Sequence, residues 1–191
     1  MATDPPPIPR RPLILAPSGG PIINRLVSAL MLRPEFYAAA AADVDGTGAT
    51  GAIICLIALL RDSPFLYHLS QTEPAWGLAL LLTALLALLR WAAVGLFALA
   101  VSRLARTRPT YRSLLRVLAY AEAPTLLIAF DPWLPPASQL LYLPDIAMNV
   151  WTFTATLIAM RAATQTSLMR AAWLAVPIYL VQRITLVLVS Q

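Results

Sequence analysis

The chain contains no lysine, and it has only one cysteine, one histidine and nine acidic residues. Without lysine it cannot form the glycine-rich phosphate loop, which requires that side chain. A single cysteine, Cys55, excludes an intrachain disulfide. A single histidine, His68, supplies too few ligands for a metal site. Because Cys55 lies inside an apolar run and His68 at the end of one, no Cys/His or Ser/His/Asp set can be assembled. The sequence therefore predicts neither an enzyme nor a bound cofactor.

Arginine supplies all 14 basic residues, and the formal net charge is +5. Codon bias in a GC-rich genome accounts for this choice, but the choice has a physical consequence. Arginine keeps its charge at any depth, whereas a buried lysine can lose its proton. The positive balance favours anionic lipid headgroups as partners. A nucleic-acid partner is disfavoured, because the arginines are divided among short connections and form no single basic face.

Long apolar runs dominate the composition. Hydrophobic residues make up 59% of the chain and charged residues 12%, against about 45–50% and about 25% in ordinary soluble domains. Because one membrane crossing takes about 20 residues, the runs predict an all-α integral membrane protein with five transmembrane helices. The expected spans are residues 47–69, 75–101, 113–133, 138–160 and 169–190.

Two segments precede the first expected span. Residues 1–21 are rich in proline, which excludes helix and favours an extended, solvated cytoplasmic tail. Residues 22–42 carry apolar side chains at helical spacing and predict an amphipathic helix in the membrane interface. Pro34 interrupts this helix, and Phe36 and Tyr37 are expected to be interfacial anchors. The alternative is that its apolar stripe packs on a partner subunit.

Positive charge collects on one predicted side of the membrane. Arginines lie before the first span, between the second and third, and between the fourth and fifth, whereas the other side has Arg61 at its border and several acidic residues. The positive-inside rule then places the N-terminus in the cytoplasm and the C-terminus outside. Six of these arginines are predicted to contact anionic lipid or an acidic partner: Arg103, Arg106, Arg108, Arg112, Arg161 and Arg170.

Four of the charged residues within the expected spans are candidates for pairs between helices, because an ionisable group inside a membrane normally has a partner. At a rise of about 1.5 Å per residue, Arg90 and Glu122 lie at similar depths, and so do Arg183 and Asp145. The sequence therefore predicts the pairs Arg90–Glu122 and Arg183–Asp145. These charges are interpreted either as a structural clamp or as a proton or ion path. The clamp is favoured, because Glu122 is the only deep carboxylate.

Three segments carry a resemblance to a known family: LMLRPEFY (Leu30–Tyr37), RTRPTYRSLLRVLAYAEAP (Arg106–Pro124) and IAMRAATQTSLMRAAW (Ile158–Trp173). Together they look like the bacterial branch of the Yip family. That family comprises five-span proteins whose eukaryotic relatives interact with Rab GTPases during membrane traffic. The resemblance covers residues 22–190 and implies four family positions: Pro34, Tyr120, Pro124 and Arg170.

Two functions compete on this evidence. The leading interpretation is a non-enzymatic scaffold or accessory subunit of a larger complex in a bacterial inner membrane. Its partners would be membrane lipids and other integral subunits, and a homo-oligomer is left open. The alternative is a transporter or channel for a small solute or ion, organised around Arg90, Glu122 and Asn149. A membrane-embedded enzyme is disfavoured by the missing nucleophile, metal set and cofactor motif.

Overall fold

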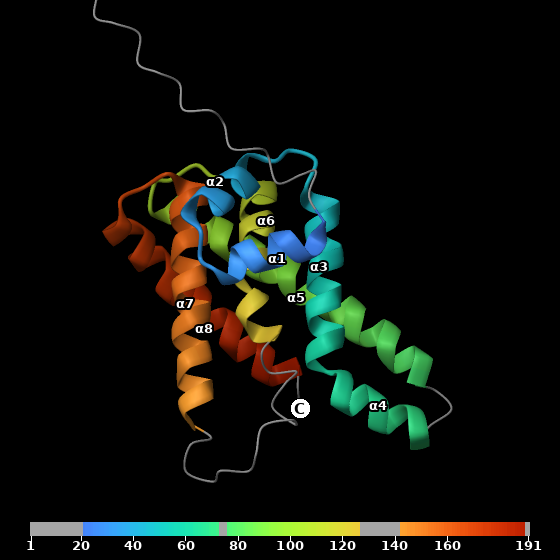
Figure 1. Cartoon of the computed structure of the whole chain (residues 1–191). Helices are drawn as coiled ribbons and strands as arrows, with labels where there is room; N and C mark the ends of the chain where they lie inside the picture. Colours follow the sequence, from blue (N-terminus) through green and yellow to red (C-terminus); the bar gives the residue numbers. More distant parts are fainter. Residues whose placement is uncertain (1–20, 73–75, 127–141, 190–191) are drawn as a thin grey trace, which may run out of the picture.

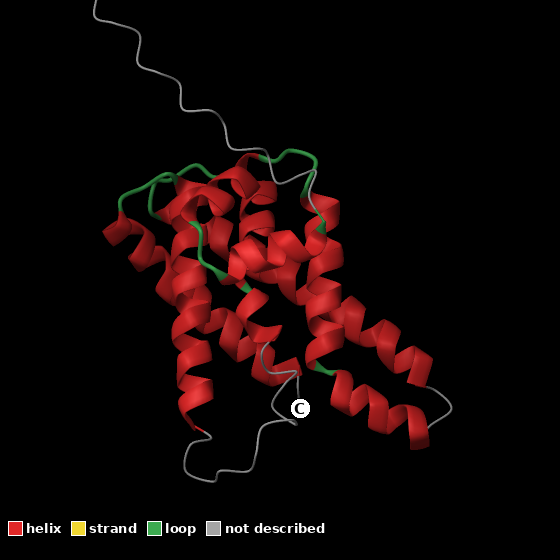
Figure 2. Cartoon of the chain, viewed as in Figure 1, coloured by secondary structure: helices red, strands yellow, loops and turns green. Residues whose placement is uncertain are grey.

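Helices account for the regular structure in the part of the chain that the computed structural model describes, residues 21–72, 76–126 and 142–189 (Figure 2). The predicted tail and the side chains of His68 and Asp145 lie outside the described residues. In chain order the α-helices are α1 (Ile22–Leu30), α2 (Pro34–Ala42), α3 (Thr47–Arg61), α4 (Ser63–Thr72), α5 (Trp76–Leu104), α6 (Tyr111–Ala121), α7 (Tyr142–Thr164) and α8 (Leu168–Val189).

Two segments of the described chain are long and apolar enough to cross a membrane, α5 and residues 146–164 of α7. α3 is a shorter apolar helix. The expected first span is divided, because α3 ends at Arg61 and α4 begins at Ser63. Pro64 explains the break, because proline lacks the N–H that a continuous helix needs there but is tolerated in the first turn of a new helix. α6 ends at Ala121 and is followed by a short 3-10 helix at residues 123–126.

α6 lies at the centre of the bundle, and α2, α3, α5 and α7 pack around it (Figure 1). Each residue from Ser113 to Ala121 is buried. α7 packs against α8, which also contacts α5. α4 and the first half of α5 extend away from the bundle beyond α3 (Figure 1). The polar side chains in the buried stretch of α6 therefore lie among protein neighbours.

α2 belongs to the core, which corrects the expectation that Phe36 and Tyr37 are interfacial anchors. Tyr37 is 0% exposed and its hydroxyl donates to the carbonyl of Ala29 at 3.2 Å. The Phe36 ring meets the ring of Tyr120 edge to face, with the centroids 4.7 Å apart. Pro34 is the reason, because it begins a second helix at a position that needs no N–H donor. That new helix turns back onto α6 and α7. Burial raises the pKa of the Tyr37 phenol, so the hydroxyl remains a neutral donor.

α1 is amphipathic, as the spacing predicts, and lies across the bundle in front of α6 (Figure 1). Ile23, Val27 and Met31 are exposed on its outer face, with 71%, 42% and 60% of their surfaces free. Leu26 and Ala29 are buried against the bundle, and Arg25 is buried with them. Exposed apolar side chains beside the core are what an interfacial helix presents to lipid.

The backbones of α5 and α6 approach closely at Gly95. A Cβ atom there would lie 2.5 Å from Leu115 Cδ2 and 3.1 Å from Tyr111 Cε2. Both neighbours are held in place, since Leu115 is 7% exposed and the Tyr111 hydroxyl donates to the carbonyl of Ala92 at 3.0 Å. Small residues at helix crossings allow this approach in membrane proteins.

Replacing Gly95 with alanine is therefore expected to lower the free energy of unfolding by about 1–3 kcal/mol, the usual cost of overpacking. Gly77 on the same helix provides the matched control, because nothing lies within 4 Å of a Cβ added there. G77A is expected to be neutral or to stabilise by up to about 1 kcal/mol. Thermal unfolding in mild detergent measures both. Equal midpoints for the two variants would contradict the close contact.

Candidate functional site

The first predicted charge pair is present inside the bundle. Arg90 Nη2 of α5 lies 3.3 Å from Glu122 Oε2, and each side chain is 8% exposed. Glu122 occupies the C-cap position of α6, where the negative end of the helix dipole disfavours an anion. The Arg90 guanidinium compensates for that unfavourable position.

Arg90 also connects this pair to α8. Its Nη1 donates to the backbone carbonyl of Gln182 at 3.4 Å. The Gln182 side chain is buried at 3% exposure, and its Oε1 accepts a hydrogen bond from the Thr156 hydroxyl of α7 at 3.2 Å. Gln182 thus links the two contacts, through its carbonyl to Arg90 and through its side chain to Thr156. We call Arg90, Glu122, Thr156 and Gln182 the central cluster.

A second polar contact joins α7 to α8. The Tyr179 hydroxyl donates to Asn149 Oδ1 at 2.8 Å and accepts from Arg183 Nε at 3.2 Å. The Arg183 guanidinium also stacks on the Tyr179 ring, 5.5 Å from its centroid. The side chain of Asp145 lies outside the described residues, so the pair Arg183–Asp145 stays a prediction. Asn149, expected in a transport path, is here an acceptor between two helices.

Arg116 of α6 is a buried cation that the sequence does not single out. Its side chain donates to the carbonyls of Ala40 and Ala41 at 3.0 and 2.7 Å, and to the Thr47 hydroxyl at 3.2 Å. The two carbonyls belong to the last turn of α2, where acceptors have no partner within the helix. A cation at that end is also favoured by the helix dipole. Arg116 thus fastens α2 to α6 and to the start of α3.

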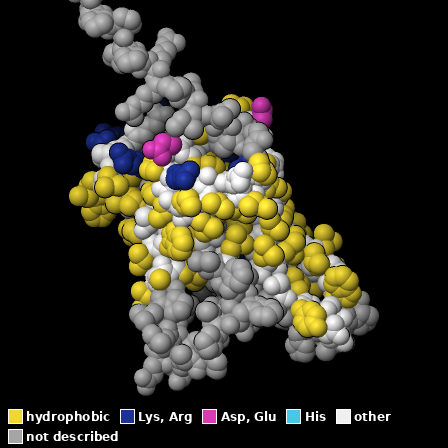
Figure 3. Space-filling model, viewed as in Figure 1, with side chains coloured by type: hydrophobic (Ala, Val, Ile, Leu, Met, Phe, Trp, Pro, Cys, Tyr) yellow, Lys and Arg dark blue, Asp and Glu magenta, His cyan; other side chains and the backbone are white. Residues whose placement is uncertain are grey.

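The six arginines predicted to meet lipid or a partner are all exposed. They lie on the α5–α6 and α7–α8 connections and on the helix turns next to them, at the end of the bundle near α2 (Figure 2). Figure 3 shows basic side chains near this end, above a broad belt of hydrophobic side chains. We call this set the arginine rim: Arg103, Arg106, Arg108, Arg112, Arg161 and Arg170.

Three arginines of the rim line one pocket at the end of α5. Arg103, Arg106, Thr107, Arg108 and Pro109 line a pocket of about 560 Å³. Arg106 takes a left-handed conformation, φ 58°, just past the end of α5. Its N–H bonds to the carbonyl of Arg103, and the N–H of Thr107 bonds to the carbonyl of Ser102. This pair of bonds is the Schellman motif, which usually has glycine at the left-handed position.

The comparisons with known proteins agree with the resemblance seen in the sequence. The Yip1 domain matches residues 28–190, most of the chain. The chain belongs to the Yip1 domain family. No curated protein and no solved structure gives a significant match. The family consists of multi-pass membrane proteins that are generally non-enzymatic and act in membrane trafficking. This Yip1 protein is therefore a multi-pass membrane protein.

The four family-like positions occupy different places in the Yip1 domain. Tyr120 is 3% exposed and packs on Phe36, and Pro124 is buried in the turn after α6. Pro34 is the first residue of α2. Arg170 is exposed at the start of α8. Three of the four thus lie in α2, in α6 or in the turn that follows α6. The fourth belongs to the arginine rim.

Proposed function

We propose that this Yip1 protein is a non-enzymatic, five-span scaffold or accessory subunit of a larger complex in a bacterial inner membrane. The observation that carries the proposal is the central cluster. Its Arg90–Glu122 pair is enclosed at 8% exposure and joined to α8 through the Gln182 carbonyl. A charge pair used in this way fixes the helices relative to one another, which is what a scaffold requires.

The outer surface of α5 supports the same proposal. Leu78, Leu81, Leu85 and Leu89 are 58%, 63%, 49% and 58% exposed. Only 22% of the most apolar 18-residue stretch of this helix is buried inside the bundle. In a membrane such a face meets lipid or the helices of another subunit.

The orientation is inferred from the arginine rim. All six of its residues are exposed near the α2 end, and the positive-inside rule assigns that end to the cytoplasm. α8 runs from this end toward the opposite one (Figure 1), so the C-terminus is assigned to the outside. Anionic lipid is the partner we expect for these cations. A reporter fused after Gln191 that reads as cytoplasmic would contradict this orientation and the five-span count.

Copurification tests the accessory role directly. The natively expressed protein is extracted in a gentle detergent, and the proteins that accompany it are identified by mass spectrometry after a second sizing column. We expect integral membrane partners in stoichiometric amount, and an untagged strain provides the background. Elution of the chain alone or only with lipid would overturn the accessory-subunit proposal, and elution as a homo-oligomer would do so too.

Transport is the second candidate, and the carboxylate of Glu122 inside the bundle is what favours it. A transporter organised around Arg90, Glu122 and Asn149 requires Glu122 to bind or release its cargo during the cycle. E122Q would then abolish flux in reconstituted vesicles while the protein stays folded. We favour the scaffold, because Arg90 and Asn149 both use their polar atoms in contacts between helices.

A further inference from the structure

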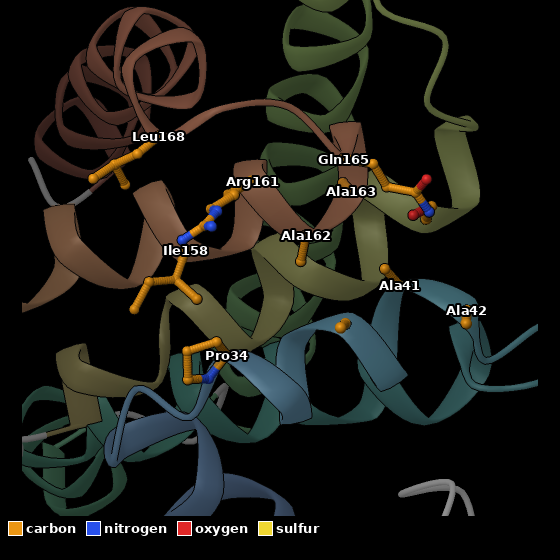
Figure 4. A pocket seen from close by; sticks show the side chains of 11 residues that line it. Pro34, Ala41, Ala42, Ile158, Arg161, Ala162, Ala163, Gln165 and Leu168 are labelled. Carbon is orange, nitrogen blue, oxygen red and sulfur yellow. The ribbon is translucent and has the colours of Figure 1, made fainter. Parts of the chain in front are cut away.

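A pocket of about 420 Å³ opens between α2 and α7 beside the α7–α8 turn (Figure 4). Eleven residues line it, and eight of them are apolar and mostly alanine. In Figure 4, Pro34, Ala41 and Ala42 come from α2, and Ile158, Arg161 and Ala162 come from α7. Its size and lining are those of a site for an apolar ligand with a few polar contacts.

The charge at this pocket has one sign. Among the described residues that line it, Arg161 alone is charged, and its side chain is exposed. A guanidinium can bind two oxygens of a phosphate at once, in a fork that matches the geometry of the anion. The ligand must therefore combine an apolar segment with an anionic group. A free phosphate would leave the apolar lining unused.

The position of the pocket along α7 selects the kind of ligand. Its lining includes Ile158, Arg161, Ala162 and Ala163, from the last turns of the segment 146–164 that is apolar enough to cross a membrane. Near the end of such a segment Arg161 lies at the level of the headgroups, and Ile158, about one turn earlier, lies closer to the acyl chains. Basic pockets between membrane helices are known to take anionic lipid headgroups.

We propose that this pocket is a binding site for one anionic phospholipid, with an acyl chain against the alanines and its phosphate on Arg161. The inference rests on the proposed function in one respect, that this end of α7 reaches the headgroup level. α2 forms one wall of the site, and Arg116 holds the carbonyl of Ala41, a lining residue, at 2.7 Å. The wall is therefore fastened before the lipid binds.

Native mass spectrometry of the full chain tests the site. The protein is delipidated in mild detergent and loaded with phosphatidylglycerol or with phosphatidylcholine. Wild type is expected to retain one phosphatidylglycerol in preference to phosphatidylcholine. R161Q is expected to lower that retention by at least about tenfold, the loss that corresponds to one charge-assisted hydrogen bond. R161K, which keeps a cation but not the fork, should retain an intermediate amount.

A second variant and a control distinguish the contribution of the apolar lining from that of the Arg161 charge. A162L places a larger side chain in the pocket and should lose the lipid although Arg161 is present. R61Q removes an arginine at the end of α3, outside both the pocket and the arginine rim, and should bind like wild type. Equal retention by R161Q and wild type would overturn the site, and so would displacement of the lipid by inorganic phosphate. The two proposals can fail separately. If the chain purifies without protein partners but still retains phosphatidylglycerol through Arg161, the accessory role is contradicted and the lipid site stands.

Discussion

Replacing Glu122 with alanine is expected to lower the free energy of unfolding by about 3–5 kcal/mol, the usual cost of removing one partner from a buried ion pair. Arg90 would keep its charge at 8% exposure and lose its carboxylate 3.3 Å away. Arginine stays charged in the interior of a protein, so Arg90 would remain an unpaired buried cation. Thermal unfolding in mild detergent, followed by tryptophan fluorescence, measures the loss.

The pair Arg61–Asp62 provides a matched control. Its atoms Nε and Oδ1 are 2.7 Å apart, closer than in the central cluster, but the Asp62 side chain is 28% exposed and the two residues are adjacent in sequence. Surface ion pairs contribute about 0–1 kcal/mol. D62A is therefore expected to change stability much less than E122A, although its bond is shorter.

Exchanging the two charges identifies the contact itself. The double variant R90E/E122R should recover most of the stability that each single variant loses. Recovery should be incomplete by about 1 kcal/mol, the value of one hydrogen bond, because a carboxylate at position 90 cannot donate to the Gln182 carbonyl. A double variant as unstable as the sum of the two single variants would show that the pair does not stabilise the fold.

Replacing Arg116 with methionine should lower the free energy of unfolding by about 3 kcal/mol or more, because hydrogen bonds from charged groups contribute about 1.5–3 kcal/mol each. The side chain is buried and makes three such bonds, two of them to the carbonyls of Ala40 and Ala41. R116K should recover less than half of the loss, since an ammonium lacks the rigid fork that reaches all three acceptors.

Hydrogen exchange locates the effect of R116M. Amides in the last turn of α2 should exchange much faster in the variant, because local opening becomes easier where a cap is lost. R112Q is the matched control, since Arg112 is an exposed arginine one turn earlier on the same helix, and its effect should stay within about 0.5 kcal/mol. Unchanged exchange in α2 of R116M would show that Arg116 does not hold that helix.

One of the two predicted contacts between charged residues is present in the structure, and the other is untested because the side chain of Asp145 is not described. Arg90 and Glu122 lie at matching depths on neighbouring apolar runs, and the structure has them in contact. Arg116 is missed because its main acceptors are backbone carbonyls, and every residue has one. The prediction that Phe36 and Tyr37 are interfacial anchors is wrong because their burial depends on tertiary structure. Pro34 marks an interruption, but no local pattern says that the helix after it turns back into the core.

The family could be recognised from three loose segments, and the Yip1 domain extends over residues 28–190. Its motifs place an aromatic residue after a proline and a tyrosine before another proline. In the structure these become the Phe36–Tyr120 contact between α2 and α6. The pocket at Arg161 could not be predicted, because it depends on where two distant stretches of alanine come to face each other.

The Arg116 contact also imposes an order on biosynthesis. Ala40 and Arg116 are 76 residues apart, so at about 5–20 residues per second the ribosome finishes α2 several seconds before it makes the arginine. During that interval the last carbonyls of α2 must find water or headgroups. α2 can therefore complete its contacts only after α6 has been made, so the N-terminal structure depends on a segment synthesised later.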